Sequence, residues 1–126
     1  MNKKERMYSR IEQHGKGLIA YFGIDENPVK LCRKLRRLEL AANRLMVDYC
    51  NGDCTETELD AYVQGPLKAS LIHIFGEQGY RSIYINHDPR GYTLKINSLE
   101  SKRLERLYRD WGGYVILAPD FSEDNS

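Results

Sequence analysis

The sequence predicts an α+β fold in a single domain. N-terminal helices are expected to pack on a small sheet formed by a β-hairpin, a crossover helix and a C-terminal strand. Residues 3–75 carry apolar side chains mainly at helical spacing, whereas residues 82–118 show the pattern of hairpin, helix and strand. A chain of 126 residues, 41% of them hydrophobic, is long enough to bury one core without metals or disulfides. Residues 1–126 are therefore expected to form one domain, with residues 120–126 as a mobile acidic tail.

The first helix is expected to be short. Met7, Tyr8 and Ile11 have helical spacing within residues 3–14, and Gly15-Lys16-Gly17 follows as a predicted stop. Residues 18–24 form an apolar run that suits either a helical turn or a buried strand, and its periodicity does not distinguish the two.

A longer helix is predicted from residue 28 to residue 49. Asn27 is a good N-cap, Pro28 suits the first helical position, and Asn51-Gly52 follows as a stop signal. Apolar residues recur at alternating intervals of four and three, which predicts a narrow seam that packs on another helix or on a sheet. The seam consists of Leu31, Leu35, Leu38, Ala42, Leu45 and Tyr49.

A third helix begins with a capping box, in which Thr55 is the N-cap and Glu58 is the third helical residue. Gly65-Pro66 is expected to break or kink this helix, because proline lacks a backbone N–H and disfavours helix at the residue before it. The helical pattern resumes over residues 67–75, and residues 76–79 are expected to form the loop into the hairpin.

Residues 82–96 predict a β-hairpin around Asp88-Pro89-Arg90-Gly91, which has the residue preferences of a type I turn. The apolar alternation selects the register, because a shift by one residue would mix aliphatic and polar side chains on both faces. The predicted cross-strand pairs are His87–Tyr92, Ile85–Leu94 and Ile83–Ile96. The opposite face would carry Tyr84, Asn86, Thr93 and Lys95.

After the hairpin, Asn97 or Ser98 is expected to cap a helix that ends near Asp110, and residues 114–118 have the composition of a buried strand. If this strand pairs with the second hairpin strand, the crossover makes the pair parallel; if it pairs with the first, the sheet is antiparallel throughout. The sequence leaves both arrangements open.

Composition narrows the function classes only slightly. The formal net charge of +1 is compatible with a protein or a nucleic-acid partner. We expect no membrane association and a cytoplasmic location, because no apolar run approaches 18 residues and residues 1–6 lack the core of a signal peptide. Cys32, Cys50 and Cys54 form no complete zinc pattern with the three histidines, so reduced thiols and no metal or cofactor are expected.

No catalytic residue is assigned. Asp88 precedes Lys95 by seven residues, as in some metal-dependent nucleases, but Thr93 stands where such a site requires a second carboxylate. We therefore expect a binding protein, with a small nucleic-acid-processing enzyme as the alternative.

Two candidate binding surfaces follow from the positions of tyrosine and basic residues, a combination that suits protein interfaces, nucleotides and single-stranded nucleic acid alike. On the basic face of the long helix, the alternative is a solvated charged surface without a ligand. The hairpin surface consists of Tyr84, His87, Arg90, Tyr92 and Lys95. The basic helix face consists of Lys30, Arg33, Arg36, Arg37 and Arg44.

Residues 86–96, N-H-D-P-R-G-Y-T-L-K-I, and residues 110–119, D-W-G-G-Y-V-I-L-A-P, resemble a family of small bacteriophage and prophage proteins. That family typically has glycine where this chain has His87 and alanine where it has Thr93. The helix ending in D-Y-C-N-G at residues 48–52 is also similar, so the resemblance spans residues 31–119.

The resemblance supplies no established activity. It implies a mobile-element setting, in which accessory proteins act by binding host machinery, including inhibition of CRISPR or nucleotide-signalling defences. We accordingly expect a non-catalytic counter-defence protein in the cytoplasm of a host bacterium, acting on a host protein or protein–nucleic-acid complex. The alternative is a nucleic-acid- or nucleotide-binding protein, and the oligomeric state is left open.

Overall fold

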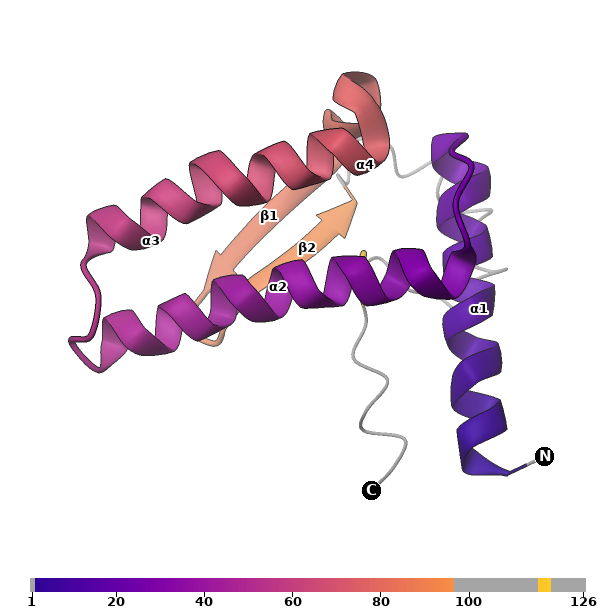
Figure 1. Cartoon of the computed structure of the whole chain (residues 1–126), viewed down its shortest axis with the longest axis horizontal. Coiled ribbons are helices and arrows are strands. Elements are labelled where there is room, and N and C mark those ends of the chain that lie inside the picture. Colours follow the sequence, from indigo (N-terminus) through magenta and orange to yellow (C-terminus); the bar gives the residue numbers. More distant parts are fainter. Residues whose placement is uncertain (1, 97–115, 119–126) are drawn as a thin grey trace.

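The structure is a computed structural model of the chain that describes residues 2–96 and 116–118 (Figure 1). In Figure 1, α2 and the run from α3 to α4 lie side by side in front of the two strands, and α1 crosses the N-terminal end of α2. Helices and a two-stranded antiparallel sheet together confirm the α+β class. The elements are α1 (Lys3–Phe22), α2 (Pro28–Cys50), α3 (Glu56–Tyr62), the π-helix η1 (Val63–Leu67), α4 (Lys68–Tyr80), β1 (Ile83–Asp88) and β2 (Gly91–Ile96).

The predicted end of the first helix at residues 15–17 is wrong, because α1 continues to Phe22 and ends at Gly23, which has a φ of 65°. Gly15 lies inside the helix, where α1 crosses the start of α2. A Cβ atom at this position would collide with the backbone carbonyl of Pro28. Glycine is therefore required at residue 15 for the close approach of two helices, and it does not act as a stop. The run from residue 18 is helical as far as Phe22.

The predicted limits of α2 are confirmed. The Asn27 side chain accepts a hydrogen bond of 3.0 Å from the backbone N–H of Lys30, and Asn51 caps the C-terminal end. The apolar seam is confirmed at Leu31, Leu35 and Ala42, which are fully buried. Tyr49, in contrast, is 39% exposed, because it lies in the last turn of α2, beyond the part that packs on the hairpin.

The capping box at the start of α3 is also confirmed, with 3.1 Å from the Glu58 backbone nitrogen to Thr55 Oγ1 and 3.4 Å from the Thr55 backbone nitrogen to Glu58 Oε1. Pro66 does not end the helix, since the chain passes through the π-helix η1 and continues as α4. Gly76, with φ 76° and ψ 167°, interrupts α4, and one further helical turn reaches Tyr80 where a loop is predicted.

The hairpin has the predicted register: Ile83 pairs with Ile96, Ile85 with Leu94 and His87 with Tyr92. Asp88 pairs with Gly91, so Pro89 and Arg90 form the turn. An Asp88 carboxylate oxygen accepts a 2.8 Å hydrogen bond from the backbone N–H of Arg90, which fixes the turn locally.

The C-terminal segment meets β2 in the antiparallel sense, so the parallel pairing expected for a crossover onto this strand is wrong for these residues. Ile116 forms an isolated antiparallel bridge with Lys95, and the backbone N–H of Leu117 donates to the carbonyl of Leu94 at 2.7 Å. The chain thus returns beside the end at which β2 finishes. The predicted helix from residue 97 or 98 to 110, residues 114–115 of the predicted strand and the tail 120–126 lie outside the described residues.

One core joins all of these parts. Side chains from α1, α2, η1, α4, β2 and the C-terminal segment are fully buried together: Leu18, Leu31, Leu35, Leu67, Leu71, Leu94 and Leu117. His14 of α1 is also buried, with Nε2 3.0 Å from the backbone carbonyl oxygen of Leu117. A histidine that sequence reasoning treated only as a possible metal ligand therefore connects the first helix to the C-terminal segment.

Candidate binding surface

The outward face of α2 carries a long exposed row of side chains with a common spacing. Six residues follow one another at intervals of three and four, and every one of them is exposed. At 1.5 Å of rise per residue the row is about 26 Å long. We name it the α2 stripe; it consists of Lys30, Arg33, Arg37, Leu40, Arg44 and Val47.

The α2 stripe combines positive charge with exposed apolar surface. Its four cations form no ion pair with any residue in the described ranges 2–96 and 116–118. Leu40 is 45% exposed and Val47 is 57% exposed, and the two are seven residues apart on the same line. Neither residue belongs to the basic helix face predicted from the sequence. In the structure they lie in line with the four cations on the exposed face of α2.

Arg36 is the one member of the predicted basic face that does not belong to the stripe. Its guanidinium donates to a carboxylate oxygen of Glu39 at 2.7 Å, and Arg36 is half-buried. Glu39 itself is only 5% exposed. The position of Arg36 is explained by this internal ion pair, because a buried carboxylate requires a partner.

Side chains on the inner face of α2 bind the edge of β2 that does not pair with β1. Glu39 accepts a 3.0 Å hydrogen bond from the backbone N–H of Leu94. The Asn43 amide oxygen accepts from the backbone N–H of Tyr92 at 2.7 Å, and its amide nitrogen donates to the Tyr92 carbonyl at 3.1 Å. These side chains satisfy backbone groups that a neighbouring strand would otherwise bind. They also fix α2 relative to the hairpin.

The structure brings only part of the predicted hairpin surface together: Tyr84, His87 and Tyr92 line one cavity of about 400 Å³, whereas Arg90 and Lys95 do not line it. Tyr92 is 6% exposed and belongs to the core, which contradicts its assignment as a contact residue. His87 is exposed but stacks on the Tyr92 ring, with centroids 4.6 Å apart, on the aliphatic side of the hairpin. Tyr84, 54% exposed, pairs with Lys95 on the opposite side, and Arg90 is exposed at the turn. Because adjacent strand residues point to opposite faces, no single partner surface covers all five residues.

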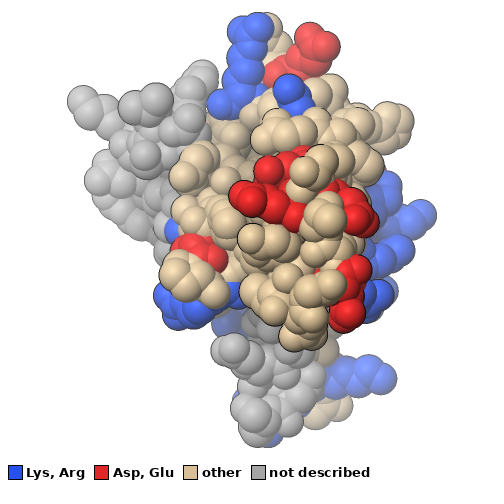
Figure 2. Space-filling model, turned by 90° about the vertical axis from the view of Figure 1, so that its left-hand side faces the viewer, with Lys and Arg blue, Asp and Glu red and all other residues tan. Residues whose placement is uncertain are grey.

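Charge is distributed unevenly over the molecule. Acidic side chains gather on the end of the molecule that carries the α2–α3 connection, and Lys and Arg lie at the margin of this view (Figure 2). Partial burial and the nearby carboxylates of Glu58, Asp48 and Asp53 raise the pKa of the Cys54 thiol. The basic α2 stripe is thus bordered by an acidic end, which restricts how a charged partner can align along it.

The side chains that sequence analysis considered for metal-dependent or thiol chemistry have the following surroundings in the described residues. Both carboxylate oxygens of Asp88 accept hydrogen bonds within the hairpin, one from the backbone nitrogen of Arg90 at 2.8 Å and the other from Asn86 Nδ2 at 3.3 Å. In residues 2–96 and 116–118 there is no group of three His, Cys, Asp or Glu side chains arranged to hold a metal ion. Burial raises the pKa of the Cys32 thiol to about 12, which disfavours the reactive thiolate.

None of the helices in the described ranges has both the length and the apolar character needed to span a bilayer.

Comparisons of the chain with protein-family models, with curated proteins and with solved structures give no match.

Proposed function

We propose that this protein is a non-catalytic binding protein of a mobile genetic element and that the α2 stripe is its docking surface for an acidic host protein. The observation that carries the proposal is the row of four cations, none of them in an ion pair within residues 2–96 and 116–118, and two exposed aliphatic residues along one helix.

The mixture of side chains favours a protein partner over a nucleic acid. Phosphate recognition uses cations and polar groups, and it gains nothing from aliphatic side chains in the middle of the contact surface. Leu40 and Val47, seven residues apart, match the interval at which an amphipathic partner helix repeats its apolar anchors. Acidic residues flanking those anchors would meet Arg33, Arg37 and Arg44.

A second copy of the chain is a poor occupant of the stripe, because two such surfaces would oppose cation to cation. In the setting that the resemblance implies, occupation of an acidic helix on a host nucleic-acid-handling complex would inhibit that complex. This is the form in which we retain the counter-defence hypothesis. Direct contact with nucleic acid is the competing function, and its sign would be steep weakening of binding with salt.

The test compares two double variants for capture of bacterial proteins from nuclease-treated lysate. Leu40→Glu/Val47→Glu places charge at the apolar anchors, and Lys4→Glu/Arg81→Glu makes two substitutions at exposed positions outside the stripe. We expect one captured protein to be lost with the first variant and kept with the second. An anchor contact worth about 2 kcal/mol corresponds to about a 30-fold loss of affinity.

The purified partner is then titrated against wild type and both variants at three salt concentrations. Equal capture by all three proteins would exclude the α2 stripe as the docking surface. Capture that disappears after nuclease treatment, together with binding of a 20-base-pair DNA that weakens steeply with salt, would favour the nucleic-acid function instead.

A further inference from the structure

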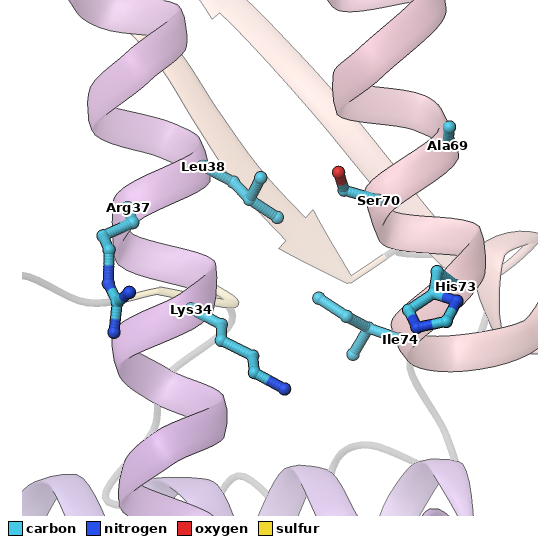
Figure 3. A pocket seen from close by; sticks show the side chains of 7 residues that line it. All are labelled: Lys34, Arg37, Leu38, Ala69, Ser70, His73 and Ile74. Carbon is cyan, nitrogen blue, oxygen red and sulfur yellow. The ribbon is translucent and has the colours of Figure 1, made fainter.

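A cavity of about 480 Å³ lies between α2 and α4, on a different side of α2 from the hairpin contact (Figure 3). Its volume is within the range of small-molecule sites. The residues that line it are Lys34, Arg37 and Leu38 from α2 and Ala69, Ser70, His73 and Ile74 from α4.

The cavity exists because α4 presents small side chains to α2. Ser70 lies across from Leu38, and its small side chain leaves space between the two helices unfilled (Figure 3), while Ala69 also belongs to the lining. Leu38 and Ile74 pack against the core beneath. The floor is therefore apolar and is supported by the rigid part of the molecule.

The opening of the cavity carries positive charge and hydrogen-bond donors. Lys34 extends from α2 into the space, and the Ser70 hydroxyl faces it from α4, whereas Arg37 extends away along the other side of α2 (Figure 3). None of the seven lining residues is acidic. A cation, a hydroxyl and an imidazole above an apolar floor are complementary to a molecule with an anionic head and an apolar body.

Lys34 has a partner that such a ligand would displace. Its ammonium group is 3.2 Å from a carboxylate oxygen of Glu26, and the two side chains are 42% and 26% exposed. The pair is partly exposed and solvent reaches both groups, so its contribution to stability is modest and an incoming anion can compete with Glu26 for Lys34. Glu26 itself does not line the cavity.

We propose that the cavity between α2 and α4 binds a small organic anion, with its apolar body on Leu38, Ala69 and Ile74 and its carboxylate or phosphate on Lys34. His73 lines the cavity on the side of Ile74, and the Ser70 hydroxyl lies at the other end, beside Leu38 (Figure 3). This site does not depend on the α2 stripe, and Arg37 is the residue that borders both.

The proposal is tested with four probes in titrations of the full chain, followed by amide chemical shifts of residues 34, 69 and 70. Octanoate and octyl phosphate combine charge with an apolar body, octanol lacks the charge, and inorganic phosphate lacks the body. We expect at least one of the two anions to bind at least tenfold more tightly than octanol and inorganic phosphate. The tighter of the two identifies the head group.

Three variants assign the binding to this cavity. Lys34→Met should weaken the anion about tenfold or more, Ala69→Phe should abolish binding by filling the space, and Glu26→Gln should tighten it several-fold by releasing Lys34. Ala69 is exposed, so the substitution should leave the fold intact, which far-UV circular dichroism checks; Ala69→Met is the second variant if Phe disturbs it.

Tighter binding in Glu26→Gln is the signature that a merely apolar pocket would not produce. Equal affinities for octanol and octanoate, or unchanged affinity in Glu26→Gln and Lys34→Met, would overturn the proposal. Leu40→Glu/Val47→Glu should leave anion binding unchanged, and Ala69→Phe should leave partner capture unchanged, so either proposal can fail without the other.

Discussion

Replacement of Asn43 by alanine should destabilise the protein more than the half-buried position of this side chain suggests. Asn43 occupies the edge of β2 as a neighbouring strand would, with its amide oxygen 2.7 Å from Tyr92 N and its amide nitrogen 3.1 Å from Tyr92 O. Tyr92 is 6% exposed, so solvent cannot fully replace the amide. Alanine at position 43 therefore leaves a backbone donor and a backbone acceptor without protein partners.

The expected size follows from these two groups. A buried polar group that loses its partner costs about 1–3 kcal/mol. Two groups give about 2–6 kcal/mol, and partial access of water through the half-buried site favours the lower half of that range. Alanine is a better helix former than asparagine, which offsets about 0.6 kcal/mol of this destabilisation. We expect a net loss of about 2–3 kcal/mol, or about 8–11 °C in Tm for a chain of this length.

The assay is urea unfolding followed by far-UV circular dichroism, with Arg44→Ala as the matched control. Arg44 is the next residue along α2, is exposed, and should change the free energy of unfolding by less than about 0.5 kcal/mol when replaced. Asn43→Asp provides a second comparison. It keeps the acceptor for Tyr92 N but sets a carboxylate oxygen against the Tyr92 carbonyl, so it should also destabilise.

Hydrogen exchange locates the effect. In Asn43→Ala the amide of Tyr92 should exchange faster than in wild type, while amides in α1 change only with global stability. A loss in Asn43→Ala no larger than that in Arg44→Ala, or a Tyr92 amide protected as in wild type, would refute the idea that α2 caps this edge.

Three further predictions concern α1 and the thiols. Burial lowers the pKa of His14 below 6.5. The contribution of His14 to the free energy of unfolding should therefore be fully present above pH 6.5. Below pH 6.5 it should decrease by up to about 1.4 kcal/mol per pH unit, down to the lowered pKa, because in that range only the unfolded chain binds the proton. Urea titrations of His14→Gln should lack this pH dependence. Gly15→Ala should destabilise the protein by about 1–3 kcal/mol, because the new Cβ atom collides with the Pro28 carbonyl. Gly65→Ala should not, because a Cβ atom at residue 65 has no neighbouring atom within 4 Å. Equal melting temperatures of the two variants would contradict this. Maleimide should label exposed Cys50 rapidly and buried Cys32, with its pKa raised to about 12, only after unfolding, as mass spectrometry of peptides would show.

The features that sequence reasoning predicted correctly are those determined over a few residues. The register of the hairpin follows from an alternation with period two, in which a shift by one residue would expose Leu94 and Ile96. The starts of α2 and α3 depend on caps formed by Asn27 and Thr55 with the backbone three residues away. Such interactions need no information about distant parts of the chain.

The errors arise where a distant segment decides the outcome. Gly15-Lys16-Gly17 has the sequence of a helix stop, but Gly15 is there because the backbone of Pro28 leaves no room for a Cβ atom. Tyr92 was assigned to a contact surface, but α2 packs on this part of the hairpin, where Asn43 binds the Tyr92 backbone, and Tyr92 is buried. Glu39 and Asn43 were not recognised, although both lie beside the buried seam at Leu35 and Ala42, where an unpaired polar side chain is unfavourable. Their position on an otherwise apolar helix face was the feature of the sequence from which their role could have been predicted.

The two faces of α2 are linked in a way that bears on the proposed binding. Glu39 and Asn43 attach the inner face to β2 by three hydrogen bonds, while Arg33, Leu40 and Val47 point outward from the same backbone. A helix that is already held in place loses little conformational freedom when a partner binds, so more of the contact energy appears as affinity. Substitution of Asn43 should therefore weaken partner binding although this residue lies outside the stripe. The loss should shrink at temperatures well below the Tm of the variant, whereas the loss caused by Leu40→Glu should persist at every temperature.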